Sequence, residues 1–217
     1  MGKVQYQTAR KNPPHLVCIC PSVAAPQTNY EEYFTNGCLR TEYLEQLDLL
    51  GFGLSKIIMA HPYHTATWSI AQNANNYPQD IKVPCFMIGG WYDHNTELMP
   101  AFFEALRNAS PSNVKNQHRL LLGPWAHGGN RASQMGGASQ GELIFKNAEH
   151  RNDSMALLFF DYHLRNIANN WNSSPIITYY QIGYNVWSNS NEWPLAGATK
   201  LLSSTKWKII DRFTRHQ

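Results

Sequence analysis

The sequence predicts an α/β fold built on a parallel sheet, and three observations carry that prediction. Short apolar runs at 16–20, 83–88 and 119–123 have the length and continuity of strands that are buried on both faces. Apolar residues at helical spacing predict amphipathic helices over about 96–108 and around 155–162. Strands and helices therefore alternate along the chain, which is the order typical of a parallel α/β sheet.

The remaining elements follow from local patterns. Residues 1–12 have a helical pattern that ends in a basic turn and is stopped by Pro13 and Pro14, but no capping residue starts it. Residues 29–80 are aromatic, Asn-rich and mostly helical in pattern, so we interpret them as a helical lid insertion. Residues 128–141 are rich in Gly and Ser, which predicts a loop.

The chain is predicted to contain two parts. Residues 1–170 form the C-terminal part of an α/β domain, and residues 171–217 begin a β-sandwich or jelly-roll, because alternation sets in after Pro175. About forty residues are too few to complete such a β-module, and the first helix has no start signal. We therefore expect a chain truncated at both ends.

Composition narrows the possible partners. Charged residues make up 15% of the chain, against roughly 25% in typical soluble domains, so we expect part of the surface to be covered by a second copy or a missing domain. The net charge of +3 is scattered, and Arg10-Lys11 is too short a basic stretch to indicate nucleic acid binding. The sequence shows neither a secretory apolar region nor an 18-residue apolar span, so it indicates no membrane partner and assigns no compartment beyond a default cytoplasmic one.

Two strand ends carry the candidate catalytic residues. Gly89-Gly90-Trp91-Tyr92-Asp93 follows one predicted strand, and Gly123-Pro124-Trp125-Ala126-His127 follows the next. Catalytic groups gather at the carboxyl ends of parallel strands, where an Asp can orient a His that acts as a general base. The non-catalytic alternatives are that Asp93 only caps a turn or helix and that His127 is a solvated residue of a loop. Trp91 and Trp125 flank this site, either as walls of an apolar substrate pocket or as plain core residues.

Two other motifs carry less weight. Gly137-Ala138-Ser139-Gln140-Gly141 matches G-x-S-x-G, but it follows a polar segment and the histidine, whereas a nucleophile elbow follows a buried strand and precedes the acid. His61 and His64 lie in a Pro-interrupted loop without carboxylate or Cys partners, so no metal site and no cofactor are predicted.

Several segments together resemble the CocE/NonD family, the cocaine esterase and X-Pro dipeptidyl-peptidase-like hydrolases. They are Asn12 to Leu16, Cys20 to Ala25, Ile81 to Pro84, Gly90 to Asp93, Leu122 to Gly128, Phe159 to Leu164, and Tyr184 to Trp187 with Trp193-Pro194. The resemblance implies a serine hydrolase that cleaves acyl esters, amides or X-Pro peptides through an acyl-enzyme, with a small molecule or peptide as substrate. It implies that Asp93 is the triad acid and His127 the general base.

The resemblance also implies where the nucleophile belongs. The family's serine stands in a G-x-S-Y-x-G turn, and Gly2 resembles the last glycine of that turn, so the serine is expected before Met1. The chain alone is then expected to be inactive. The alternative is a catalytically dead product or pseudoenzyme that acts only in binding or association.

Overall fold

The computed structural model describes residues 2–26, 28–128, 135–195 and 197. Its main sheet has the order β3-β4-β7-β8, with β3 at Phe86–Gly90, β4 at Arg119–Gly123, β7 at Ile177–Gln181 and β8 at Val186–Ser190. β3, β4 and β7 are parallel, and β8 is antiparallel to β7. The predicted α/β class is thus confirmed.

The predicted strand at 16–20 does not form a regular strand, although the segment runs beside β3 and makes isolated bridges to it. Ile19 and Ser22 make isolated parallel bridges to Cys85 and Ile88 beside β3, and Ile19 N donates to Pro84 O at 3.0 Å. Pro21 has no N–H to donate, and Val23 has a φ of 45°, outside the extended region. These two residues explain why the segment does not continue as a regular strand.

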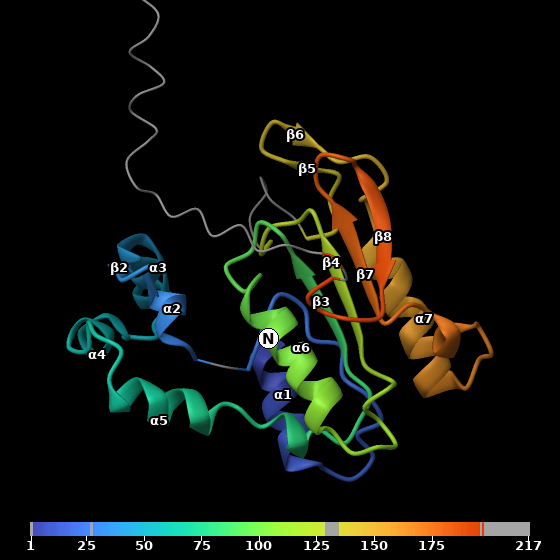
Figure 1. Cartoon of the computed structure of the whole chain (residues 1–217), viewed down its shortest axis with the longest axis horizontal. Coiled ribbons are helices and arrows are strands. Elements are labelled where there is room, and N and C mark those ends of the chain that lie inside the picture. Colours follow the sequence, from blue (N-terminus) through green and yellow to red (C-terminus); the bar gives the residue numbers. More distant parts are fainter. Residues whose placement is uncertain (1, 27, 129–134, 196, 198–217) are drawn as a thin grey trace, which may run out of the picture.

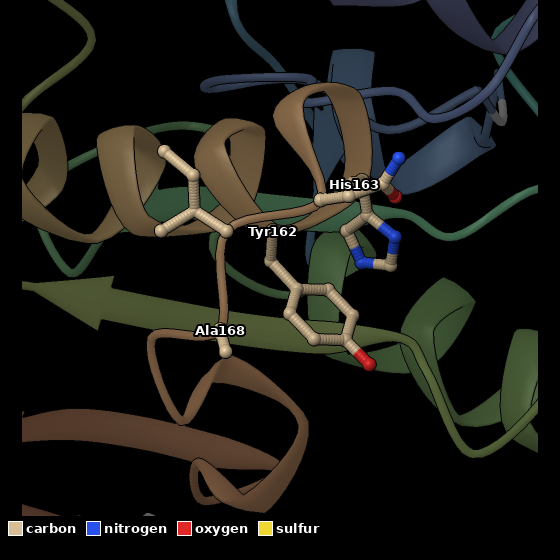
Figure 2. A pocket seen from close by; sticks show the side chains of 5 residues that line it. Tyr162, His163 and Ala168 are labelled. Atoms are coloured by element: carbon tan, nitrogen blue, oxygen red, sulfur yellow. The ribbon is translucent and has the colours of Figure 1, made fainter.

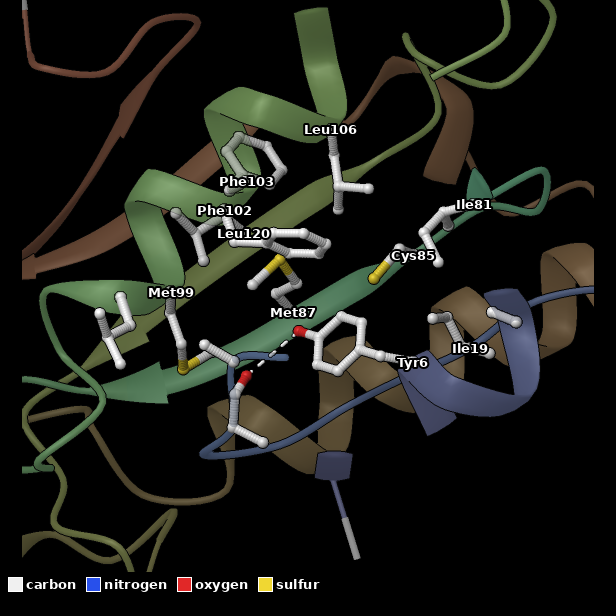
Figure 3. Packing of buried hydrophobic residues seen from close by; sticks show 14 of the residues in the cluster. Tyr6, Ile19, Ile81, Cys85, Met87, Met99, Phe102, Phe103, Leu106 and Leu120 are labelled. Carbon is white, nitrogen blue, oxygen red and sulfur yellow. Dashed lines mark hydrogen bonds between the residues drawn. The ribbon is translucent and has the colours of Figure 1, made fainter. Parts of the chain in front are cut away.

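Helices cover both faces of the sheet (Figure 1). α1 (Gly2–Lys11) and α6 (Leu98–Ala109) pack on one face, where Tyr6, Met99 and Phe102 meet Met87 of β3, as Figure 3 shows. α7 (Arg151–Arg165) packs on the other face. Alternate strand residues point to opposite faces, so covering both faces buries every residue of β3 and β4.

The predicted insertion is a separate group of short elements beside the body (Figure 1). These are α2 (Tyr30–Tyr33), β1 (Phe34–Thr35), β2 (Cys38–Leu39), α3 (Thr41–Leu49), α4 (Ser55–Met59) and α5 (Ala66–Ala74). The 3-10 turn η1 (Pro78–Asp80), at the end of the predicted insertion, packs against α1 and α6 of the body. The insertion has its own small core, built from Tyr33, Phe34, Leu44, Ile58 and Trp68. A role as a lid remains a prediction.

The C-terminal strands differ from the prediction of a separate β-module that begins at residue 171. After the 3-10 turn η2 (Trp171–Ser173), β7 pairs in parallel with β4, with Leu121 opposite Thr178, and thus extends the main sheet. The alternating pattern identified the strands correctly, but a local pattern carries no information about which edge a strand joins. A jelly-roll further along the chain stays a prediction, since residues 198–217 lie outside the described part.

The end of the predicted loop at 128–141 forms a short strand instead of loop. Residues 129–134 lie outside the described part, but β5 (Ser139–Gln140) pairs with β6 (Leu143–Ile144) in a short antiparallel hairpin. Within the described residues, no helix is both long and apolar enough to span a membrane.

Candidate active site

The loops that follow β3 and β4 are held in register beyond the ends of the strands. Trp91 N donates to Gly123 O at 2.9 Å, and Tyr92 N donates to Trp125 O at 3.0 Å. A Cβ atom on Gly90 would lie 2.0 Å from Trp125 O, so a residue with a side chain at this position must displace that backbone. The glycine therefore permits the close approach that brings the two loops together.

A tight turn holds Asp93 in place. Asp93 N donates to Gly90 O at 3.1 Å, and the Thr96 hydroxyl donates to Gly90 O at 2.7 Å and is also bonded to Asp93 O. The side chain of Asp93 is fully buried. The acid is thus anchored by the strand end itself.

Asp93 and His127 form the pair that the sequence predicted. His127 Nδ1 lies 3.1 Å from Asp93 Oδ1, and the His127 side chain is 51% exposed. Because Nδ1 faces the carboxylate, we assign the ring proton to Nδ1, which leaves the lone pair of Nε2 available to accept a proton. An accessible, oriented imidazole of this kind is what a general base requires.

The carboxyl group of Asp93 is held in its ionised form. Burial by itself raises its pKa, but hydrogen bonds from His127 and His94, together with their charges, outweigh burial and bring the pKa well below its ordinary value. An ionised carboxylate in this position can stabilise a positive charge on the imidazole that faces it.

Sequence reasoning missed two residues that also hold Asp93. His94 Nδ1 lies 3.0 Å from Asp93 Oδ1, and its ring stacks on His127 with centroids 4.7 Å apart. Asn95 N donates to the same oxygen at 3.2 Å, and Asn95 Nδ2 donates to Val23 O at 3.0 Å. Their position directly after Asp93 was the available signal, but adjacent side chains ordinarily diverge, and only the turn brings these together.

The insertion reaches the site through Tyr43. Its ring lies 4.9 Å from that of His94, and its hydroxyl donates to Glu32 Oε1 at 3.1 Å. Lys3 Nζ of α1 lies 3.6 Å from the same Glu32 oxygen. Burial and the neighbouring Glu32 raise the pKa of Tyr43 far above its usual value, so its hydroxyl stays protonated.

The two tryptophans that flank the site pack against the two cores of the sheet. Trp125 is completely buried among Phe86, Leu121 and Phe159 on the α7 face of the sheet. Trp91 packs against the core on the α1 and α6 face, and its Nε1 donates to Tyr180 O at 2.7 Å. Trp91 is half-buried and Trp125 is buried, and they pack against cores on opposite faces, which favours the packing interpretation over that of a shared substrate pocket.

The other candidates lie outside this cluster. Ser139 is an exposed residue of the β5–β6 hairpin, and no helix follows it directly, so it lacks the setting of a nucleophile elbow. The His64 ring bonds to Gln72 Oε1 at 3.0 Å, and the backbone oxygen of His61 accepts from Trp68 Nε1 at 2.9 Å, so both residues are held within the insertion. A pocket at the end of α7, lined by residues such as Tyr162 and His163, involves neither Asp93 nor His127 (Figure 2).

Comparisons with known proteins identify one family model and several solved structures that are similar to this chain. Residues 40–129 match the family model of the X-Pro dipeptidyl-peptidases (S15 family). The crystal structure of an aminopeptidase from a marine sediment archaeon, Thaumarchaeota archaeon, is 20% identical with a TM-score of 0.64, covering 85% of this chain and 36% of its own. A CocE/NonD family hydrolase from Staphylococcus aureus is 20% identical with a TM-score of 0.60, covering 90% of this chain and 33% of its own. No curated protein matches the chain.

These matches indicate the class of protein to which the chain is similar. The family model is that of a hydrolase family, and the similar solved structures share the α/β fold of this chain. The family model agrees with the sequence resemblance to the CocE/NonD and X-Pro dipeptidyl-peptidase-like hydrolases, and the segment that it matches contains both Asp93 and His127. The chain spans about a third of the length of the solved structures that it matches.

Proposed function

We propose that Asp93 and His127 are the acid and the general base of a serine hydrolase that cleaves acyl ester, amide or X-Pro peptide bonds. The observation that carries the proposal is the 3.1 Å contact between His127 Nδ1 and Asp93 Oδ1 at neighbouring parallel strand ends. A serine hydroxyl attacks the carbonyl carbon while His127 Nε2 takes its proton. His127 then protonates the leaving group, and water hydrolyses the acyl-enzyme by the same route in reverse.

We place the nucleophile before Gly2, outside the printed sequence. A Cβ atom on Gly2 would lie 2.3 Å from Ala24 Cβ and 2.8 Å from Ser22 O, so the start of α1 packs tightly against this segment. Between these two residues, Val23 O accepts from Asn95, which also donates to Asp93. Gly2 therefore packs on the segment that holds the acid in place through Asn95, and the need for glycine there fits the last position of a nucleophile turn.

The test is to express the chain extended by the in-frame codons that precede Met1 and to label it with a fluorophosphonate. We expect labelling at a serine before Gly2 and turnover of at least one of three substrates: an activated ester, an anilide or an X-Pro anilide. His127→Gln should lower kcat by on the order of 10⁴–10⁶, and Asp93→Asn by about 10⁴.

Two matched variants make this test specific. Ser139→Ala removes the serine of the G-x-S-x-G match at 137–141, and His150→Gln removes an exposed histidine. Both variants should keep full activity. Labelling at Ser139, or full activity in His127→Gln, would contradict the proposed function. Which of the three substrates turns over assigns the bond that is cleaved.

A second function, association without catalysis, is favoured by the exposed apolar side chains of the insertion. Leu49, Leu50 and Phe52 are 87%, 73% and 62% exposed. Apolar residues gathered in this way are typical of surfaces that another chain covers. Sedimentation of the 217-residue chain tests this, because a monomer that persists across a hundredfold range of concentration would contradict self-association.

A further inference from the structure

We propose that Asp93, His94 and His127 form a binding site for a divalent transition metal ion such as Zn²⁺. Each of the three offers one ligand atom, and these atoms lie within 4.8 Å of one another. Asp93 Oδ1 lies 3.0 Å from Nδ1 of His94 and 3.1 Å from Nδ1 of His127. Zn²⁺ at about 2.0–2.1 Å from each ligand in tetrahedral geometry places its ligand atoms roughly 3.3 Å apart, so ligand atoms that are up to 4.8 Å apart must move closer together when the ion binds.

An unpartnered oxygen supports this site independently. The Asp93 side chain is fully buried, and its second oxygen, Oδ2, has no hydrogen-bond partner among the described residues. A buried carboxylate oxygen without a partner is costly, and the charge of a nearby cation lowers that cost. The His94 and His127 side chains are 21% and 51% exposed, so an ion can enter from solvent and keep water as a fourth ligand.

Asn95 shows what the protein must change to bind the ion. Its Nδ2 donates to Val23 O at 3.0 Å and also lies 3.1 Å from His94 Nε2. Because the carbonyl of Val23 can only accept, His94 Nε2 accepts as well, and the proton of the metal-free ring lies on Nδ1. Metal binding at Nδ1 moves this proton to Nε2, so the Asn95 amide must turn for its buried, unpartnered Oδ1 to accept the new N–H, and this breaks the bond from Nδ2 to Val23 O.

The same change affects His127. Coordination through Nδ1 places the ring proton on Nε2, so the ring can no longer accept a proton from a nucleophile. Metal binding and the proposed general-base role of His127 therefore exclude each other, and the ion acts as a reversible inhibitor. The site itself is independent of the proposed function, because its occupation is measured without a substrate.

The experiment titrates the metal-stripped 217-residue chain with ZnCl₂ by calorimetry. We expect one ion to bind per chain. His94→Phe keeps an aromatic ring between Tyr43 and His127 and leaves the Asp93–His127 pair in place, and it should weaken binding roughly tenfold or more. His150→Gln is the matched control, since His150 is an exposed histidine beside two carboxylates and its loss should change nothing.

Unchanged affinity in His94→Phe, or lost affinity in His150→Gln, would overturn the metal site. A second measurement covers the case in which His94→Phe does not fold. Imidazole ¹⁵N NMR of the unsubstituted chain should show Zn²⁺ moving the ring protons of His94 and His127 from Nδ1 to Nε2. Zinc binding that leaves both rings unchanged would also refute the site, while fluorophosphonate labelling of the extended chain would still test the hydrolase proposal separately.

Discussion

His118 should make the stability of this protein depend on pH in the weakly acidic range. The residue precedes β4 and is 1% exposed. Its Nδ1 accepts from Cys85 N at 3.2 Å, and its Nε2 lies 3.0 Å from Ser110 Oγ, which donates to Pro78 O. Burial, and then the charge of Arg119 and Arg107, lowers the pKa of His118 from 6.5 to about 4.

The folded protein should lose stability as the pH falls, because the unfolded chain binds a proton at His118 more readily. Between pH 6.5 and 4 the unfolded chain binds a proton at His118 that the folded chain does not, so stability is complete above pH 6.5 and is lost as the pH falls. At about 1.4 kcal/mol for each pH unit, the full loss is about 3 kcal/mol. About 2 kcal/mol of it should be gone at pH 5.

The assay is urea unfolding of the wild type and of His118→Gln at pH 7.5, 6.0, 5.0 and 4.5. The variant is less stable at pH 7.5, because glutamine replaces only part of the hydrogen bonding, but its free energy of unfolding should fall by about 2 kcal/mol less between pH 7.5 and 5. His150→Gln, at an exposed position, should follow the wild type. Parallel pH curves for the wild type and His118→Gln would refute the argument.

Two further changes test the packing that positions the site. Gly90→Ala should destabilise the fold by more than about 3 kcal/mol, because the added Cβ would lie 2.0 Å from Trp125 O. Gly183→Ala should cost only about 1 kcal/mol, because Gly183 has a φ of +93° but faces open space. Equal losses of stability in thermal unfolding would contradict this reasoning. Tyr6→Phe removes a buried 3.1 Å hydrogen bond to Ala24 O and should cost about 1–2 kcal/mol in urea unfolding, and an unchanged midpoint would show that water replaces the hydroxyl.

Much of the fold and the main pair could be predicted because their signals are local. An apolar run that ends in glycine marks β3 and β4, and Asp93 and His127 follow these runs directly. Parallel strands end at the same edge of a sheet, so two polar residues just beyond neighbouring strands must approach each other. The pairing of Gly90 with Gly123 in the sheet, and the 3.1 Å contact beyond it, agree with that expectation.

The sequence by itself determined the α/β class, the positions of the principal strands and helices, and the acid and histidine at two strand ends. Only the tertiary structure decided that β7 joins β4, that Trp91 and Trp125 belong to cores on opposite faces, and that His94 bends back onto Asp93. The physical reason is that strand partners and buried contacts between distant residues are selected by the packing of the whole molecule. Periodicity and turn residues report only the conformation of the segment that contains them.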